Sequence, residues 1–111
     1  MIYLLRSRAT SEQMKEMLEA WELTVKLAVD IEREVLAGGG HAHSDCEAVL
    51  LADGSQQDDI WGVSYLPEVN HIRYDSMVNL RPRQGLFNTE IQDPAVRDRI
   101  AKLIQQFLEG V

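Results

Sequence analysis

The sequence has one cysteine, few cations and no long apolar run, and each shortage excludes a class of protein. Cys46 has no second cysteine to pair with, so no intramolecular disulfide can form. This fits a reducing compartment, and we expect a cytoplasmic protein. No window approaches about 18 consecutive apolar residues, so we expect no transmembrane helix and no membrane partner. The N-terminus lacks the basic region and long apolar stretch of a signal peptide.

The shortage of cations gives the chain an acidic balance. The 111 residues include 11 Lys and Arg against 18 Asp and Glu, a formal net charge of -7. A domain with this charge repels a polyanion, so we expect no nucleic-acid partner. The length suits a single domain over residues 1–111, and the 45% hydrophobic share is enough for a modest core.

Three segments carry the caps and the apolar spacing typical of helices. We expect helices over residues 11–22, 44–53 and 94–109. Their start signals are Thr10 with Gln13, Ser44 with Glu47, and Asp93 followed by Pro94. In the first helix, Met14, Met17, Leu18 and Trp21 lie on one face and are expected in the core. In the last, Phe107 and Leu108 lie together near the end and would suit the core or a dimer face.

Residues 24–37 admit two interpretations. Val25, Leu27 and Val29 alternate with other residues, which favours two strands joined by a tight turn at 32–34. The alternative is one long helix from residue 11 to 37. Strict alternation over seven residues favours the hairpin.

Residues 60–80 carry the strongest strand pattern. Aromatic and β-branched residues alternate with others from residue 60, stop at the turn-like stretch 67–70, and resume after it. We expect residues 60–66 and 71–80 to pair as an antiparallel hairpin. Residues 81–92 are predicted to be irregular.

Together with a first strand over residues 2–5, these elements predict an α+β fold. Strands joined by hairpin turns and separated by single helices favour an antiparallel sheet built from hairpins. We expect the three helices to pack on one face of that sheet.

Several short motifs together resemble a known family. They are Val29-Asp30-Ile31-Glu32-Arg33, Ala37-Gly38-Gly39-Gly40, Asp45-Cys46-Glu47-Ala48-Val49-Leu50-Leu51, Asp53-Gly54-Ser55, Asp59-Ile60-Trp61-Gly62, Arg81-Pro82-Arg83-Gln84-Gly85 and Glu90-Ile91-Gln92-Asp93-Pro94. The combination resembles a small bacterial family, frequent in cyanobacteria and known as a domain of unknown function, DUF5674. The resemblance spans most of the chain but implies no assigned activity. His41 stands where the family typically has an acidic residue.

The first candidate site is the glycine turn, residues 38–45. Gly39 and Gly40 let the backbone approach a ligand closely, and a helix start follows with free N–H groups for an anion. The structural alternative is that the glycines only allow a sharp turn between a strand and a helix. His43 is a candidate ligand contact.

Two kinds of chemistry could use the same turn. His41, His43 and Asp45 alternate and could offer three metal ligands, although loop histidines more often contact solvent or a cap. Cys46 lies near a helix start with His43 as a possible base, but a buried structural cysteine is the favoured interpretation.

The second candidate site is the arginine loop, residues 81–84. Arg81, Arg83 and Gln84 stand close together in an otherwise acidic chain, and the guanidinium fork binds carboxylates and phosphates. Strand alternation would place Arg81 and Arg73 on one sheet face. Pro82 favours an extended conformation of Arg81, and extended spacing over residues 81–83 would point Arg81 and Arg83 to the same side, both exposed. Ion pairing within the loop is the structural alternative.

No motif in the sequence indicates a particular reaction. We expect no cofactor. Our leading hypothesis is a binding module for a small anionic ligand or a protein partner, and a homodimer, with a site built from the glycine turn and the arginine loop. The alternative is a small hydrolase or transferase that uses His43 with Cys46 or a bound metal. A third possibility is an acidic module that docks on a basic protein surface.

Overall fold

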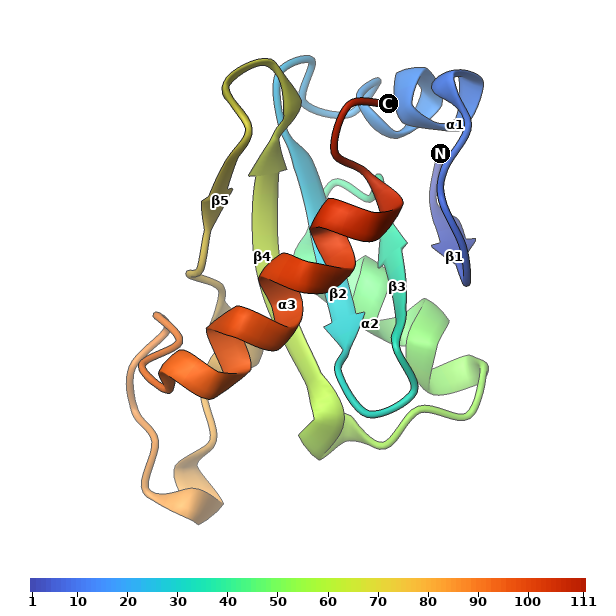
Figure 1. Cartoon of the computed structure of the whole chain (residues 1–111). Coiled ribbons are helices and arrows are strands. Elements are labelled where there is room, and N and C mark those ends of the chain that lie inside the picture. The colour runs from blue at the N-terminus through green and yellow to red at the C-terminus, as the bar shows by residue number, and fades with distance from the viewer.

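The computed structural model describes residues 1–111, and the α+β prediction is confirmed. Five strands form one antiparallel sheet in the order β1-β3-β2-β4-β5 (Figure 1). The strands are β1 (Tyr3–Leu5), β2 (Val25–Asp30), β3 (Val35–Gly38), β4 (Ile60–Leu66) and β5 (His71–Arg73), and the helices are α1 (Ser11–Met17), α2 (His43–Ala52) and α3 (Pro94–Phe107). The β2–β3 hairpin predicted over residues 24–37 is therefore present, and the long helix is excluded.

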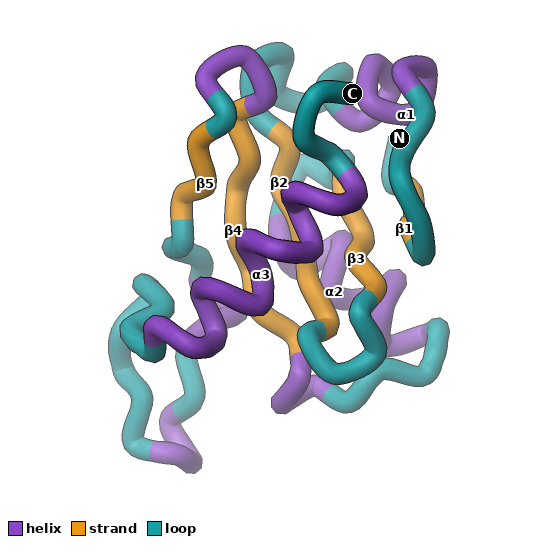
Figure 2. Tube along the Cα trace, viewed as in Figure 1, coloured by secondary structure: helices purple, strands orange, loops and turns teal.

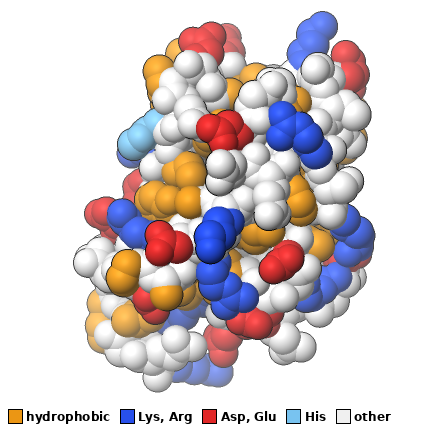
Figure 3. All heavy atoms as spheres, in the orientation of Figure 1, with side chains coloured by type: hydrophobic (Ala, Val, Ile, Leu, Met, Phe, Trp, Pro, Cys, Tyr) orange, Lys and Arg blue, Asp and Glu red, His pale blue; other side chains and the backbone are white.

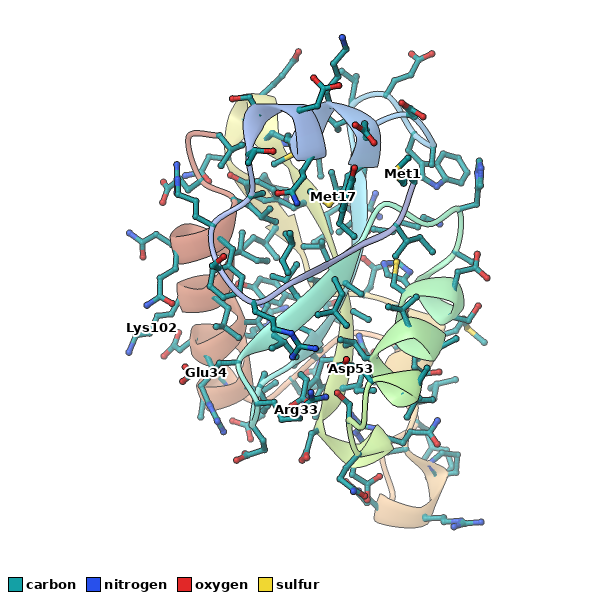
Figure 4. All side chains as sticks on the ribbon, turned by 90° about the vertical axis from the view of Figure 1, so that its right-hand side faces the viewer. Met1, Met17, Arg33, Glu34, Asp53 and Lys102 are labelled. Carbon is teal, nitrogen blue, oxygen red and sulfur yellow. The ribbon has the colours of Figure 1, made fainter.

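The helices cover both faces of the sheet, so the prediction that they share one face is wrong. Figure 4 shows the sheet from the side, with α3 on one face and α2 on the other. Leu27 and Val29 face the larger core cluster, which also contains Ile100 and Ile104 of α3. Ala28, between them on β2, belongs to a smaller cluster with Cys46 and Leu50 of α2. Small side chains on that face leave room for a second helix.

The last helix has the predicted cap and apolar stripe. The Asp93 side chain accepts a hydrogen bond from the backbone N–H of Ala95, and Pro94 takes the first helical position. The stripe of Ile100, Leu103, Ile104 and Phe107 is buried. Phe107 and Leu108 both belong to the core of this chain, so the core explains their spacing.

The first helix begins as predicted and ends early. Thr10 and Gln13 form the expected capping box, but the helix stops at Met17 and residues 18–23 form turns. Trp21, expected in the core, is 48% exposed. Its indole N–H donates to the carbonyl of His41 at 3.0 Å, and the Lys26 amine lies 4.6 Å from its ring. These contacts draw Trp21 away from the helical face that the spacing predicted.

The second helix has a different cap from the predicted one. Its N-cap is Ala42 rather than Ser44, because the Asp45 carboxylate accepts a hydrogen bond from the Ala42 N–H at 3.2 Å. The other end is as expected, with Gly54 at φ 103°. There the N–H groups of Gly54 and Ser55 bond the carbonyls of Leu51 and Leu50, which is a Schellman motif.

The strand predicted over residues 71–80 is much shorter than expected. It pairs with β4 only over His71–Arg73, and the chain then leaves the sheet for a 3₁₀ turn at Met77–Asn79. Figure 2 shows loops and short turns filling the segment between β5 and α3. The Asn79 side chain nevertheless stays at the sheet, where it accepts from the N–H of Gly62 at 2.7 Å and donates to its carbonyl at 2.9 Å.

One carboxylate ties three distant parts of the fold together. Asp53, at the end of α2, accepts from Arg6 at 2.6 Å and from Arg33 at 2.7 Å. Arg6 follows β1 and Arg33 lies in the β2–β3 turn, where Figure 4 shows it beside Asp53.

None of the helices has the length and apolar character needed to span a bilayer.

Candidate anion-binding site

The arginine loop closes the free edge of β4 next to Asn79. Arg81 exchanges backbone hydrogen bonds with Leu86 at 2.8 and 2.9 Å, which brings the two ends of the loop together. Between them Pro82–Gln84 form a 3₁₀ turn, and Gly85 adopts φ 74°. Residues 82–84 thus form a tight turn, and the extended spacing predicted from Arg81 to Arg83 is wrong.

Arg81 is held inside the protein by this turn. Only 6% of the residue is exposed, and its Nη2 donates to the carbonyl of Ile60 at 2.6 Å. The guanidinium carbon lies 4.0 Å from the ring centre of Trp61, within the range of a cation–π contact. Arg73 is instead exposed on β5 and pairs with Asp75 at 3.7 Å. The prediction that Arg73 and Arg81 share one sheet face is wrong.

The Arg81 charge has no carboxylate partner. Nη1 makes no hydrogen bond with the protein, and Nε is buried without a partner. Burial lowers the pKa of the Arg81 guanidinium from its ordinary value, while the charges of Asp58, Glu47 and Asp59 act in the opposite direction through space. None of these carboxylates forms an ion pair with it, and guanidinium keeps its charge in proteins. The site therefore holds a nearly buried cation whose donors are mostly unused.

A hollow of about 370 Å³ opens beside Arg81. Arg81, Arg83 and Gln84 line it from the loop, and Gln57 and Asp58 line it from the turn before β4. Arg83 is exposed, as expected, whereas the expectation that Arg81 is exposed is wrong. Arg81 and Arg83 thus line one hollow, but a tight turn places them there instead of an extended chain.

The glycine turn lies elsewhere and borders its own hollow, of about 350 Å³. Gly39 and Gly40 line that hollow together with Met1, Ile2, Glu19, Ala20, His41 and Asp45. Gly38 pairs with Leu27 on β2, whereas Ile60, the partner of Arg81, pairs with Asp30 at the other end of that strand. The glycine turn and the arginine loop therefore do not form one site.

Close packing explains why glycine occupies the turn. Gly39 has φ 104°, and a Cβ there would overlap the carbonyl oxygen of Met1. Figure 4 shows Met1 close to Met17, the second residue that such a Cβ would meet. The glycines thus serve the contact between the N-terminus, α1 and the end of β3.

His43 points away from the glycine turn, toward β4. Its Nε2 lies 2.9 Å from the carbonyl of Val63 and 3.2 Å from the hydroxyl of Ser64. A carbonyl partner requires a hydrogen on Nε2. Burial lowers the pKa of His43 and so favours its neutral form, and nearby Lys26 acts in the same direction; the bond to Val63 and the Asp75 charge oppose the shift.

Cys46 faces the small core cluster and is fully buried. Its thiol lies 3.5 Å from the carbonyl of Lys26. Burial raises the pKa of the Cys46 thiol, although a hydrogen bond with the backbone of Gly40 opposes the shift. A covered thiol with a raised pKa is a poor nucleophile, so the geometry does not support the pairing of Cys46 with His43.

The three predicted metal ligands do not form a metal-binding group. His41, His43 and Asp45 are not gathered, and no cluster of three or more His, Cys, Asp or Glu side chains is placed to hold an ion. His43 is engaged with β4, while Asp45 caps α2.

Sequence reasoning overlooked Trp61 as a contact of Arg81. Its alternation with Val63 and Tyr65 correctly indicates a strand, but no spacing connects it with an arginine 20 residues later. Asp58, in the turn before β4, also lies on the hollow, and no spacing connects it with the arginine loop. The only signal was the concentration of arginines after β5 in an acidic chain.

Comparison with known proteins gives a family and no activity. No curated protein and no solved structure matches this sequence. The model of one family, described as a protein of unknown function (DUF5674), matches residues 3–107 and so includes every strand and helix of the fold. The chain belongs to the DUF5674 family.

Proposed function

We propose that this domain binds a small anion at the arginine loop, with Arg81 as the main contact. The proposal rests on one observation: the Arg81 guanidinium is nearly buried, is stacked on Trp61 and has no carboxylate partner. A buried charge without a counter-ion costs free energy, and a bound carboxylate or phosphate would remove part of that cost. The stack on Trp61 already fixes the guanidinium, so little side-chain entropy is lost on binding.

The other residues of the hollow narrow the class of anion. Arg83 supplies a second positive charge, and the Gln84 amide can donate a hydrogen bond. Asp58 repels a bare anion but accepts a hydrogen bond from a hydroxyl group. We therefore expect a hydroxycarboxylate such as malate to bind more tightly than succinate, which has the same charge and lacks the hydroxyl.

Thermal unfolding in the presence of anions tests the proposal. A ligand that binds only the folded state raises the free energy of unfolding, by about 2.7 kcal/mol at 100 times its Kd. Malate should raise the melting temperature of the wild type more than succinate or phosphate does. Sodium chloride at the same ionic strength is the reference. Arg81→Lys should abolish this increase, because an ammonium cannot reproduce the stacked fork.

Two further variants separate binding at this loop from a general effect of charge. Arg83→Ala removes an exposed side chain from the hollow and should reduce the increase without lowering basal stability much. Arg73→Ala removes an exposed arginine on β5, outside the hollow, and should leave the increase unchanged. Equal stabilisation of all four proteins by malate would refute the proposal.

The glycine turn is not included in this site, because it borders a different hollow. The homodimer expected from the sequence stays a separate prediction, which sedimentation velocity of the purified chain would test.

A further inference from the structure

A second hollow, of about 450 Å³, lies beside Trp61 and carries an inference beyond the anion site. Its apolar wall comes from Trp61 on β4, Ile91, Val96 on α3 and Leu86. Figure 3 shows hydrophobic side chains gathered at the lower left, where Figure 1 places the segment between β5 and α3. The volume is within the range of about 300–1,000 Å³ that small organic ligands occupy.

The indole N–H of Trp61 has no hydrogen-bond partner, although it is buried. An unpaired buried donor costs free energy that a hydrogen-bond acceptor would recover. One face of the ring is held by the Arg81 guanidinium at 4.0 Å, so the aromatic wall is fixed before any ligand arrives. A fixed aromatic wall suits a planar molecule, and an acceptor on that molecule would satisfy the indole N–H if the side chains that cover it shift on binding.

The charged side chains around this hollow already have partners. Glu90 pairs with Arg97 at 2.7 Å, and the Asp93 carboxylate caps α3 by accepting from the Ala95 N–H at 2.9 Å. The Gln84 side chain also lines the hollow and makes no hydrogen bond with the protein. Arg81 does not line it. The Trp61 N–H, the Gln84 amide and the NH2 of Asn88 are neutral groups without partners, and the two lining carboxylates would repel an anion, so the lining favours an uncharged ligand.

We propose that this hollow binds a small uncharged aromatic molecule with a carbonyl or ring-nitrogen acceptor, its ring packed between Trp61 and Val96. The probe for this class is benzamide, which has a flat apolar ring and one carbonyl. Benzoate has the same shape with a negative charge, and it separates this hollow from the anion site at Arg81.

Indole N–H resonances in a proton–nitrogen spectrum of the full chain provide the test. The signal of Trp61 should move downfield and saturate as benzamide is added, with magnetisation transfer between the benzamide ring and the Val96 methyl groups. The signal of Trp21, whose N–H already donates to His41, should not move, and Trp21→Phe assigns the two signals. Benzoate should shift the Trp61 signal less than benzamide at equal concentration.

A matched pair of variants tests the position of the ligand. Val96→Phe fills the hollow and should weaken benzamide binding by about tenfold or more. Ala95→Phe adds the same ring at the neighbouring exposed position, outside the lining, and should not weaken it. The inference is overturned by an unmoved Trp61 signal, by equal shifts of both indoles, or by undiminished binding to Val96→Phe. If Val96→Phe does not fold, absence of magnetisation transfer in the wild type would also overturn it.

Discussion

Asn79 and Gly62 are joined by two hydrogen bonds, so that one side-chain amide replaces one residue of a missing strand. A backbone neighbour would bond the same N–H and the same carbonyl. A third bond, from the Asn79 amide to the carbonyl of Thr89 at 3.0 Å, anchors the segment that leads to α3. The segment after β5 is thus fastened to the sheet through a side chain that is almost completely buried.

Asn79→Ala should lower the free energy of unfolding by about 2–3 kcal/mol, because it leaves buried backbone groups unpaired. Urea unfolding measures this change. Asn88→Ala is the control, since Asn88 is exposed and its side chain makes a single bond to the N–H of Glu90. Its expected loss is below about 1 kcal/mol. Losses of equal size would show that the bonds to Gly62 contribute little.

The glycine turn can be tested with two alanine substitutions at similar backbone angles. Gly39 and Gly54 have φ 104° and 103°, so alanine is strained at both, by about 1–2 kcal/mol. A Cβ at Gly54 meets nothing within 4 Å, whereas one at Gly39 overlaps the Met1 carbonyl. Gly39→Ala should therefore destabilise the fold by about 1–3 kcal/mol more than Gly54→Ala, the usual range for overpacking. Similar melting temperatures for the two variants would contradict the packing argument.

The lowered pKa of His43 gives the stability of the fold a definite pH dependence. Below the ordinary histidine pKa of 6.5, the unfolded chain binds the proton before the folded chain does. The contribution of His43 is therefore complete above pH 6.5 and is lost as the pH falls toward its lower folded-state value. His43→Gln can still donate to Val63 but cannot titrate, so its stability should fall less than that of the wild type over this window. Parallel pH profiles from urea unfolding would contradict the shift.

Cys46 should react slowly with a disulfide reagent in the folded protein. The thiol is fully buried and its pKa is raised, and both properties reduce the amount of accessible thiolate. The reaction releases a coloured thiolate from the reagent. Its absorbance should rise slowly in buffer and quickly in denaturant at the same pH. A rapid reaction in buffer would reopen the possibility of a nucleophilic role for this residue.

Local signals in the sequence identified most of the elements. The capping box of Thr10 and Gln13 and the Asp93–Pro94 start depend on neighbours within four residues, so the sequence contains the whole interaction. The β2–β3 hairpin follows from alternation alone. The predicted start of α2 is one residue late, because the Asp45 carboxylate bonds the N–H of Ala42 and the helix begins after Ala42, whose side chain carries no capping group that a sequence pattern could show.

The errors at the candidate site come from contacts that span the chain. The alternation after residue 73 is as regular as before it, but the Asn79 amide takes the position at β4 that a strand would fill. Arg81 is buried because Trp61, 20 residues earlier, offers a ring to stack on. Sequence spacing fixes neither relationship, so the arginine loop could be identified as a cluster of charge but not as a half-buried site.

The short edge strands of the sheet also bear on whether two copies of this chain can pair edge to edge. Its two outer strands, β1 and β5, are three residues long, and the edge of β4 beyond β5 is occupied by Asn79 and Arg81. A sheet grows into fibrils when a long row of free N–H and C=O groups accepts a strand from the next molecule. Here such a strand would find only three residues to pair with on β1 or β5, and beyond β5 the side chains of Asn79 and Arg81 already bond the edge of β4. Short edge strands are one of the devices that discourage such pairing, and this chain uses them without a proline in any strand.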